Sequence, residues 1–477
     1  MKILKRTHNL LFCSVGLLLF SCKISAPNQQ NTSQQLPADY KSIKDSTNVA
    51  TLNWRTYFED KDLTSLIDSA LKTNLDLLSA LQKLEILRSG VKISNSMLFP
   101  IVNGYLSAGQ RKYGLYTMDG AGNISTEITK GQTVPIHLPD YYIGLQTSWE
   151  LDVWGKLRNK KKSAVARYLA GIEGKNLTVT GLVSEIARMY YELLALDNEL
   201  DIINETISLQ TNALAIVVAQ KESGYLTSLA VNQFEAQLLN SKALQIKTEQ
   251  AITECENKIN FLLGRLPQKI SRKKEMFQVA LPSNIQAGIP ADLLTYRPDI
   301  RQAEYELLAA KADVKAARAA FYPNFNITGA FGYQAFKTGF LFLSPESVAY
   351  TLLGGLTSPL INRAAIKREF KNANANQLTA LYNYQKSIIN GYMEVYNELL
   401  NVNRLGQIYE LKTQEAEILR KSIEASTELY SAGRANYLEV LMTQRNALES
   451  RLDLINTRKM QHYSVIQVYK ALGGGWQ

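Results

Sequence analysis

The sequence is poor in the residues that most enzymes use at their active sites. Its 477 residues include three histidines and three cysteines, and no cysteine–histidine pair has the spacing of a zinc site. The chain also lacks a phosphate-binding loop and a Ser–His–Asp order. These absences argue against an enzyme, and we expect no cofactor and no bound metal.

The three cysteines do not provide a disulfide framework. Cys13 lies in the apolar run near the start of the chain, Cys22 follows that run, and Cys255 lies in a segment with helical apolar periodicity. If Cys13 is removed with a signal peptide and Cys22 is acylated, no intramolecular pair remains. Cys255 is predicted to be a small buried residue.

Long apolar runs are missing after residue 22. No stretch there reaches 18 apolar residues, so the sequence predicts no transmembrane helix in that part. The net charge is +10, but the basic residues are scattered along the predicted helices rather than collected on one of them. This distribution does not indicate nucleic-acid binding.

The start of the chain has the pattern of an export signal. Lys2, Lys5 and Arg6 precede an apolar stretch that is shorter than the ~20 residues needed to span a bilayer. The sequence LFSC at 19–22 resembles a bacterial lipobox. That resemblance implies cleavage before Cys22 and attachment of lipid to its sulfur.

We therefore expect a lipoprotein signal peptide at 1–21 and a lipidated, polar tether at 22–50. Lys23 follows the cysteine, in place of the aspartate that often retains lipoproteins at the inner membrane, which points to the outer membrane. The alternative is an ordinary signal peptide cleaved near Ala26, which would remove Cys22.

The remainder of the chain is an internal duplication. The segment GYLTSLAV, from Gly224, resembles GRANYLEV, from Gly433, at an offset of 209 residues. Further upstream, residues 75–100 resemble residues 298–323 at an offset of 223. Two blocks that match in the same order indicate a tandem repeat. The predicted repeats are residues 51–264 and 298–477, joined by a linker at 265–297.

Each repeat contains a long run of residues spaced by seven, most of them apolar, which is typical of a coiled-coil helix. We predict helices over about 156–220 and 365–430, each about 100 Å long at 1.5 Å per residue. A glycine and a second helix of about 38 residues follow each of them, so each repeat should contain a long helical hairpin. The residues of this seam are Val165, Ile172, Val179, Ile186, Leu193, Leu200, Ile207 and Leu214 in the first repeat and Leu381, Ile388, Val395, Val402, Tyr409, Ala416 and Ile423 in the second.

Ahead of each long helix, apolar and polar residues alternate, which is typical of β-strands. The clearest alternation lies at 141–151 and 325–334, and weaker patterns lie at 103–114 and 347–357. Each repeat should therefore contribute two strands. Four strands are too few to close a membrane barrel, which needs about eight, but three chains would supply about twelve.

Four long motifs resemble those of a known family. They are SWELDVWGKLR at 148–158, YRPDIRQAE at 296–304, AAFYPNF at 319–325 and GRANYLEVLMTQR at 433–445. They resemble signatures of the TolC/OprM-type outer-membrane factors of efflux systems, specifically the NodT-like lipoprotein branch. The resemblance implies a mainly α-helical fold with a small β part. In it, a homotrimer forms a twelve-stranded outer-membrane β-barrel, a periplasmic α-helical barrel and an equatorial region that includes the linker.

The resemblance also implies a function. The chain would be a passive exit duct for drugs or small solutes, which an inner-membrane RND pump delivers through a periplasmic adaptor. It would lie in the outer membrane, lipid-anchored, and extend into the periplasm. The alternatives are a duct for type I protein secretion and a structural envelope lipoprotein that transports nothing. A copper or silver exporter is a further possibility, although the eight methionines are scattered and form no obvious metal ladder.

The motif around residue 298 has a predicted structural role. Pro298 suits the first turn of a helix, and Asp299 suits the positive end of that helix. Arg297 and Arg301 are expected to bind acidic residues of the equatorial region. The basic stretch SRKK at 271–274 is expected to be a solvated loop.

Two prolines and two tryptophans mark the predicted helix–strand boundaries. Pro100 and Pro323 stand where helix should change to strand, because proline cannot continue a helix. Trp149 and Trp154 suit a membrane–water interface, where such rings accumulate. The alternative for both tryptophans is burial in a packed core.

The two hairpin glycines mark the predicted tips. Gly224 and Gly433 permit tight turns. We expect these turns, together with the neighbouring Tyr225 and Arg434, to face a periplasmic adaptor.

The family resemblance places a gate near the second tip. Leu438 falls on the apolar gate position of the family and Glu439 on an acidic one. Threefold symmetry would make each of them a ring, in which leucines block ions by dewetting and carboxylates favour cations. The alternative for Leu438 is packing in the hairpin seam, as expected for its repeat mate Leu229.

Overall fold

The computed structural model describes residues 37, 40, 52–279, 281, 287–359, 361 and 363–476. The predicted signal peptide, the lipidation site Cys22 and most of the predicted tether lie outside these residues. Tyr40, near the end of the predicted tether, is buried, and its ring stacks on Tyr392 with 5.6 Å between centroids. Tyr40 itself is therefore packed against a helix.

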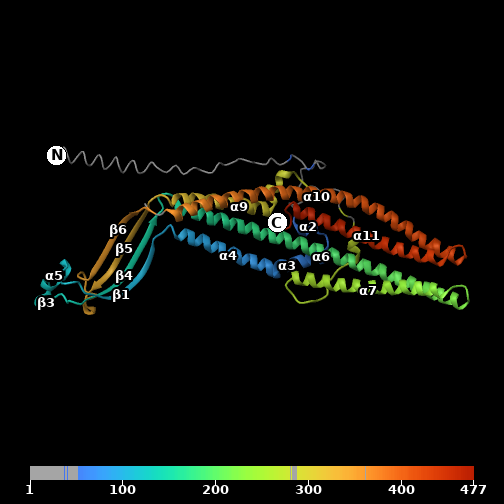
Figure 1. Ribbon diagram of the computed structural model, residues 1–477, viewed down its shortest axis with the longest axis horizontal. Helices are drawn as coiled ribbons and strands as arrows, with labels where there is room; N and C mark the ends of the chain where they lie inside the picture. The colour runs from blue at the N-terminus through green and yellow to red at the C-terminus, as the bar shows by residue number, and fades with distance from the viewer. Residues whose placement is uncertain are drawn as a thin grey trace. The chain divides into compact units, whose positions relative to one another are not determined.

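The four predicted strands are confirmed and form one antiparallel sheet (Figure 1). Strands β1 (Ile101–Arg111) and β4 (Leu138–Leu151) come from the first repeat, and β5 (Asn324–Ala335) and β6 (Val348–Thr357) come from the second. The order in the sheet is β1-β4-β5-β6. The two repeats therefore meet between β4 and β5, and β1 and β6 are the edges.

The longer loop, between β1 and β4, carries small elements that the sequence did not predict. Helix α5 (Met118–Ser125) is followed by the short strands β2 (Glu127–Thr129) and β3 (Gln132–Thr133), which pair with each other. The hydroxyl of Thr117 caps α5 by accepting from the N–H of Gly120. The shorter loop, between β5 and β6, holds a 3₁₀ turn, η4 (Thr338–Phe340).

Each strand adjoins a helix in the chain, and the helices keep the order of the strands. Helix α4 (Leu75–Ser96) precedes β1, α6 (Lys156–Glu222) follows β4, α9 (Pro298–Ala319) precedes β5, and α10 (Ala364–Ser431) follows β6. Contacts of α4 with α6, of α6 with α9 and of α9 with α10 place them side by side in that order (Figure 1). The two predicted long helices are confirmed to within two residues at each end.

Two further helices complete the hairpins. Helix α7 (Ser228–Leu262) returns along α6, and α11 (Tyr437–Ala471) returns along α10 and also contacts α6. The order of helices near the tips is therefore α7-α6-α11-α10. Gly224 and Gly433 form the turns with φ values of 78° and 69°, a left-handed conformation that glycine adopts at little cost.

The main apolar core lies around the middle of α6. Helices α2 (Trp54–Tyr57) and α3 (Lys61–Thr73) and the 3₁₀ turn η2 (Lys274–Gln278) contribute to it. Leu193 of the predicted seam is fully buried there. Cys255 is also buried, as predicted, and burial raises the pKa of its thiol to about 12.

A second apolar cluster joins the start of the second repeat to the end of the chain. The 3₁₀ turn η3 (Pro290–Asp292) and helix α8 (Leu293–Tyr296) lead into α9. Leu293 and Ile300 pack in this cluster with residues of α10 and α11.

A part of α6 is more apolar than the sequence analysis suggests. By length and composition, an 18-residue window of this helix is apolar enough to cross a membrane. Core helices pass the same test, and α6 packs against neighbouring helices on both sides. The window is therefore weak evidence for a membrane span.

Candidate functional site: the sheet surfaces, the linker contacts and the tips

The register of the four-stranded sheet separates its side chains into two surfaces. Val102 faces the same way as its cross-strand partners Thr147, Gly329 and Leu352, because directly paired residues share a face. We call this surface the apolar face, since it is dominated by aliphatic and aromatic side chains. Its members include Leu106, Ile143, Leu145, Trp149, Phe331, Tyr333, Tyr350, Leu352 and Leu356.

The apolar face is largely exposed within the chain. Leu106, Tyr350 and Leu352 are each at least 75% exposed. A soluble protein rarely leaves such a broad apolar surface in water. This face therefore requires a covering, and an apolar band on a sheet is the pattern of a barrel wall in contact with lipid.

The opposite surface, which we call the polar face, is lined by uncharged polar residues at its centre. Asn103, Gln146, Ser148, Thr328 and Thr351, one or two from each strand, share a recess of about 290 Å³. Their amides and hydroxyls suit contact with water. The alternation of polar and apolar residues thus gives the sheet one face suited to water, the polar face, and one suited to an apolar environment, the apolar face.

The two edge strands have no strand partner among the described residues of the chain. Strand β1 pairs only with β4, and β6 pairs only with β5. Each edge therefore presents a row of main-chain donors and acceptors that needs a partner, above all in lipid.

The tryptophans lie where the helices meet the sheet. The indole N–H of Trp149 donates to the carbonyl of Leu98 at 3.0 Å, and that of Trp154 donates to the carbonyl of Pro323 at 2.8 Å. The Trp154 ring is about half exposed and stacks on Tyr322. Pro100 immediately precedes β1, and Pro323 immediately precedes β5, so both prolines stand at the change from helix to strand.

Arg297 ties three helices together. Its guanidinium donates to Asp299 at 2.8 Å, to Glu394 of α10 at 2.9 Å and to the carbonyl of Ala471, at the end of α11, at 2.6 Å. Burial lowers the pKa of Arg297, but the bonds to the two carboxylates outweigh this effect and raise it. The guanidinium of Arg297 fits against α10 because residue 391 is glycine. A Cβ at Gly391 would lie 3.2 Å from the Arg297 Nε atom.

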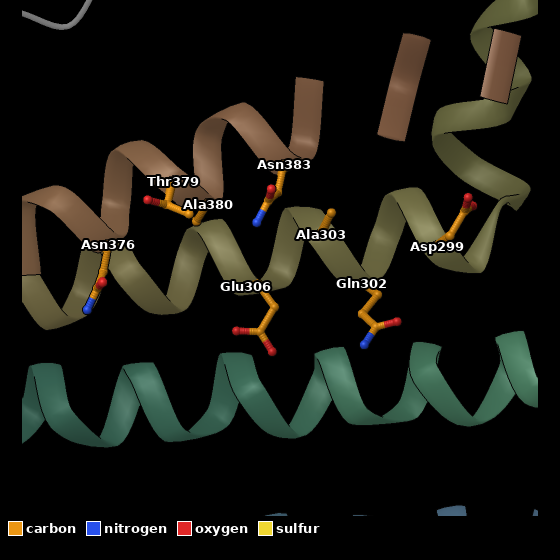
Figure 2. A pocket seen from close by; sticks show the side chains of 8 residues that line it. All are labelled: Asp299, Gln302, Ala303, Glu306, Asn376, Thr379, Ala380 and Asn383. Atoms are coloured by element: carbon orange, nitrogen blue, oxygen red, sulfur yellow. The ribbon is translucent and has the colours of Figure 1, made fainter. Parts of the chain in front are cut away.

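The same motif borders an open groove between α9 and α10. The groove has a volume of about 460 Å³. Figure 2 shows its lining side chains, among them Asp299, Gln302 and Glu306 on α9 and Asn376 and Asn383 on α10.

Arg301, one turn after Arg297, pairs with Glu173 of α6 at 2.9 Å. The expectation that both arginines bind acidic residues agrees with these contacts.

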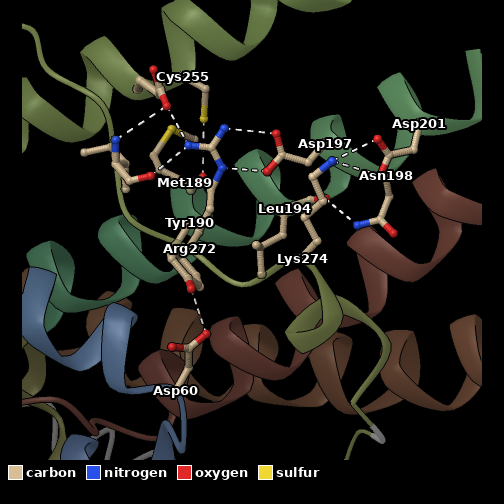
Figure 3. A network of polar contacts seen from close by, with 12 residues as sticks. Asp60, Met189, Tyr190, Leu194, Asp197, Asn198, Asp201, Cys255, Arg272 and Lys274 are labelled. Carbon is tan, nitrogen blue, oxygen red and sulfur yellow. Dashed lines mark hydrogen bonds and ion pairs between the residues drawn. The ribbon is translucent and has the colours of Figure 1, made fainter. Parts of the chain in front are cut away.

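Arg272 corrects the expectation of a solvated loop at 271–274. It donates to both carboxylate oxygens of Asp197 on α6, at 2.5 and 2.9 Å (Figure 3). It also donates to Glu256 on α7 at 2.5 Å. The Asp197 side chain is only 7% exposed. Burial lowers the pKa of Arg272, but the two carboxylates outweigh it and raise the pKa. The linker is therefore fastened across the first hairpin.

A histidine on α11 holds the linker from the other side. His462 Nε2 lies 3.1 Å from the carbonyl oxygen of Phe277, and its ring stacks on Tyr191 with 4.1 Å between centroids. Burial lowers the pKa of His462 to about 4, so the ring is neutral near pH 7. Sequence reasoning did not single out this residue, because its partners lie far away in the chain.

The second tip presents both predicted gate residues. Leu438 is 46% exposed, and Glu439 is exposed in the first turn of α11. The side chain of Asn436 caps this helix by accepting from the N–H groups of Leu438 and Glu439 at 2.9 and 3.0 Å. Leu438 is therefore held at a fixed position without being buried inside the chain.

The expectation that Leu229 packs in the hairpin seam is wrong within the chain, since Leu229 is 59% exposed. The residues that pack the tips together are instead Val217, Ala230 and Phe234 of the first hairpin, with Tyr437 and Leu441 of the second. Tyr225 and Arg434 are exposed at the two turns.

Comparisons with known proteins agree with this architecture. A family model described as "Outer membrane efflux protein" matches residues 66–265 and 289–474. The chain is 28% identical to the cation efflux system protein CusC of Escherichia coli O6:H1 over 475 residues, 98% of each chain. It is 27% identical to the solvent efflux pump outer membrane protein SrpC of Pseudomonas putida over 470 residues, 96% of this chain and 97% of SrpC.

A third relative, the probable outer membrane lipoprotein SilC of Salmonella typhimurium, is 28% identical over 476 residues, 98% of each chain. Among solved structures, a crystal structure of CusC superposes with a TM-score of 0.79 at 26% identity. It covers 94% of this chain and 99% of CusC.

Proposed function

Because the chain belongs to the outer membrane efflux protein family and is an outer-membrane efflux channel, we propose that three copies assemble into one continuous exit duct. The four strands of each copy form a twelve-stranded barrel whose apolar face meets lipid and whose polar face lines the lumen. The helical layer continues this wall into the periplasm. The observation that carries the proposal is the division of the sheet into two faces by its register.

The free edges of the sheet support the assembly. Edge strands cannot remain unpaired in lipid, and β1 of one copy is complementary to β6 of the next. The helical layer also has two free edges, α10 on one side and α4 with α7 on the other. Apolar residues spaced by seven are exposed on both, Leu239 and Ile246 on α7 and Leu411 and Ile418 on α10. Such stripes suit helix packing between copies.

The partners follow from the ends of the duct. We infer that the turns at Gly224–Tyr225 and Gly433–Arg434 contact a periplasmic adaptor that connects the duct to an inner-membrane RND pump. Leu438 and Glu439 form the narrow rings at this end. The exported compounds are drugs or small solutes, and the pump rather than this chain selects them, since relatives of similar identity carry names that refer to cations and to solvents.

The N-terminal lipid is a second proposed anchor. Cys22 becomes the first mature residue and carries lipid, which the barrel makes partly redundant. Labelled palmitate should enter the wild-type protein and be absent from Cys22→Ser. Equal labelling of the variant would show that Cys22 is not the lipid site.

Thiol labelling tests the duct wall. The variants are Ser148→Cys on the polar face and Leu352→Cys on the apolar face, each in the full chain reconstituted in lipid vesicles. The remaining thiol within the described residues, Cys255, is buried and has a raised pKa, so background labelling should be low. A charged, membrane-impermeant maleimide should label Ser148→Cys several times faster than Leu352→Cys. Equal labelling, or the reverse order, would overturn the assignment of the faces.

A further inference from the structure

The polar face contains one row in which a tyrosine stands beside three very small residues. Tyr105 on β1 pairs with Gly144 on β4, Gly144 pairs with Gly332 on β5, and Gly332 pairs with Ala349 on β6. Tyr142 lies two residues before Gly144, on the same face. Tyr105 and Tyr142 therefore lie next to a part of the polar face where Gly144 and Gly332 leave the main chain uncovered by side chains.

The two glycines allow β4 and β5 to approach closely on this side. A Cβ built on Gly144 would lie 2.6 Å from the Cα atom of Gly332, and a Cβ on Gly332 would lie 2.6 Å from the Cα atom of Gly144. Real side chains never come so near. Glycine at both positions is therefore required for this close approach, and neither residue covers the polar face with a side chain.

The tyrosines pack against each other over this uncovered part of the main chain. Their ring centroids lie 6.0 Å apart with planes tilted by 49°. The Tyr142 hydroxyl oxygen lies 2.7 Å from the position that a Cβ of Gly144 would occupy, and it is buried without a hydrogen-bond partner among the described residues. The Tyr105 ring is 46% exposed, so one aromatic surface remains open.

We propose that Tyr105 and Tyr142 form an aromatic shelf on the wall of the duct, which binds aromatic organic cations as they pass. The proposal rests on the proposed function, because it requires the polar face to line the lumen. The neighbouring wall carries uncharged amides and hydroxyls and the exposed aliphatic side chains Ile101 and Leu353, so Tyr105 and Tyr142 are the aromatic residues of this face within the four strands. An open tyrosine ring attracts both flat aromatic molecules and positive charge.

Asp140 adds the charge that favours a cation. It lies on the same face two residues before Tyr142, and its carboxylate accepts from Gln334 Nε2 at 2.7 Å. The carboxylate lies two strand residues from Tyr142 and four from the row of Tyr105, so the rings and the carboxylate can recognise two properties of one solute. The rings prefer an aromatic cation to an aliphatic one, whereas the carboxylate attracts both.

Ethidium and tetrabutylammonium provide matched probes, because each carries one positive charge and only ethidium is aromatic. Binding to the full-length trimer in lipid nanodiscs is followed by ethidium fluorescence and by competition with tetrabutylammonium, with empty nanodiscs as background. We expect Tyr105→Ala to weaken ethidium binding roughly threefold to tenfold, the loss of one ring contact, and to weaken tetrabutylammonium binding less, because that probe loses only cation–π attraction and no stacking.

Four further variants separate the explanations. Tyr105→Phe and Tyr142→Phe keep the rings and should bind ethidium as the wild type does. Asp140→Asn should weaken both cations alike. Tyr350→Ala removes a ring from the apolar face and should change neither. Unaltered ethidium binding in Tyr105→Ala, or an equal loss in Tyr350→Ala, would overturn the shelf. If thiol labelling at Ser148 fails as well, the duct wall itself is wrongly assigned.

Discussion

The first long helix and the second are repeats of one another, yet they occupy different environments. Helix α6 has 67 residues, of which 24 are buried, whereas α10 has 68 residues, of which four are buried. Both carry apolar residues at intervals of seven. Helix α6 has neighbours on both sides, α4 and α7 on one and α9 and α11 on the other, while the helices that contact α10 are α9, α11 and the short α8 among the described residues.

Seam mates such as Ile186 and Val395 are both fully buried, but repeat mates outside the seam can differ in exposure. Ile202 on α6 and Leu411 on α10 are repeat mates at the 209-residue offset, but Ile202 is 9% exposed and Leu411 is 66% exposed. At this pair of positions the repeats share an apolar residue but not its cover. Ile202 packs in the core of the chain, and Leu411 is left for a neighbouring copy.

The largest effect is expected from Leu193→Asp in the interior helix. A carboxylate at this fully buried position has no partner, which should cost about 4 kcal/mol and unfold the protomer at moderate temperature. Far-UV circular dichroism during heating measures the loss. Leu209→Asp, at an exposed position of the same helix, is the control and should melt close to the wild type.

A somewhat smaller effect is expected from Arg272→Ala. The first repeat supplies two carboxylates for this arginine, Asp197 and Glu256, whose repeat mates are Gly406 and Val465. Removing the guanidinium leaves a buried carboxylate without its cation, which should cost about 3 kcal/mol and release the linker. Denaturant unfolding and limited proteolysis measure the two consequences.

The control for the linker is Lys274→Ala. Lys274 pairs with Asp201, but both side chains are about half exposed, so the loss should stay below about 1 kcal/mol. Equal destabilisation by the two variants would show that the linker does not depend on the buried pair.

Leu411→Asp tests the edge helix. Because Leu411 is exposed within the chain, the protomer should keep its helical content, while the trimer should dissociate about tenfold more readily. Light scattering in detergent measures the oligomer. Ile202→Asp, at the mate position, should instead damage the protomer. A trimer of unchanged stability in Leu411→Asp would place the contact between copies elsewhere.

The smallest change in stability is expected at the tips. Leu438→Gly should raise single-channel conductance in planar bilayers, and Glu439→Gln should lower cation preference, with the trimer intact in both. The mates in the first hairpin are Leu229 and Ala230, and Ala230 is fully buried. Leu229→Gly should therefore leave conductance unchanged. An intact Leu438→Gly trimer with wild-type conductance would move the gate away from this position.

Periodicity predicted the long elements of the fold because it sums over many residues. The heptads located both long helices, and the glycines at 224 and 433 located their ends. Alternation located four strands because each is at least ten residues long. The elements α5, β2 and β3 were missed, since eight, three and two residues are too few to show a period.

The contacts of the linker could not be predicted for a different reason. Arg272 stands in a short basic stretch that has the composition of a loop. Its main partner, Asp197, lies 75 residues earlier on a helix face that only the folded chain brings near. The pair Tyr105–Tyr142 also required the register of the sheet, which sequence alternation alone leaves open.

Each strand of the sheet continues into one helix of the helical layer. This one-to-one match also sets the relative diameters of the two parts of any tube built from this chain. Each strand in a tilted barrel takes up about 6 Å of the circumference, whereas a packed helix takes up about 8–10 Å. The tube must therefore widen by a factor of about 1.3–1.7 where sheet gives way to helices, whatever the number of copies. Because α7 and α11 replace α4 and α9 within the layer, the number of helices stays the same down to the tips. The far mouth can then become narrow only if the hairpins themselves lean inward.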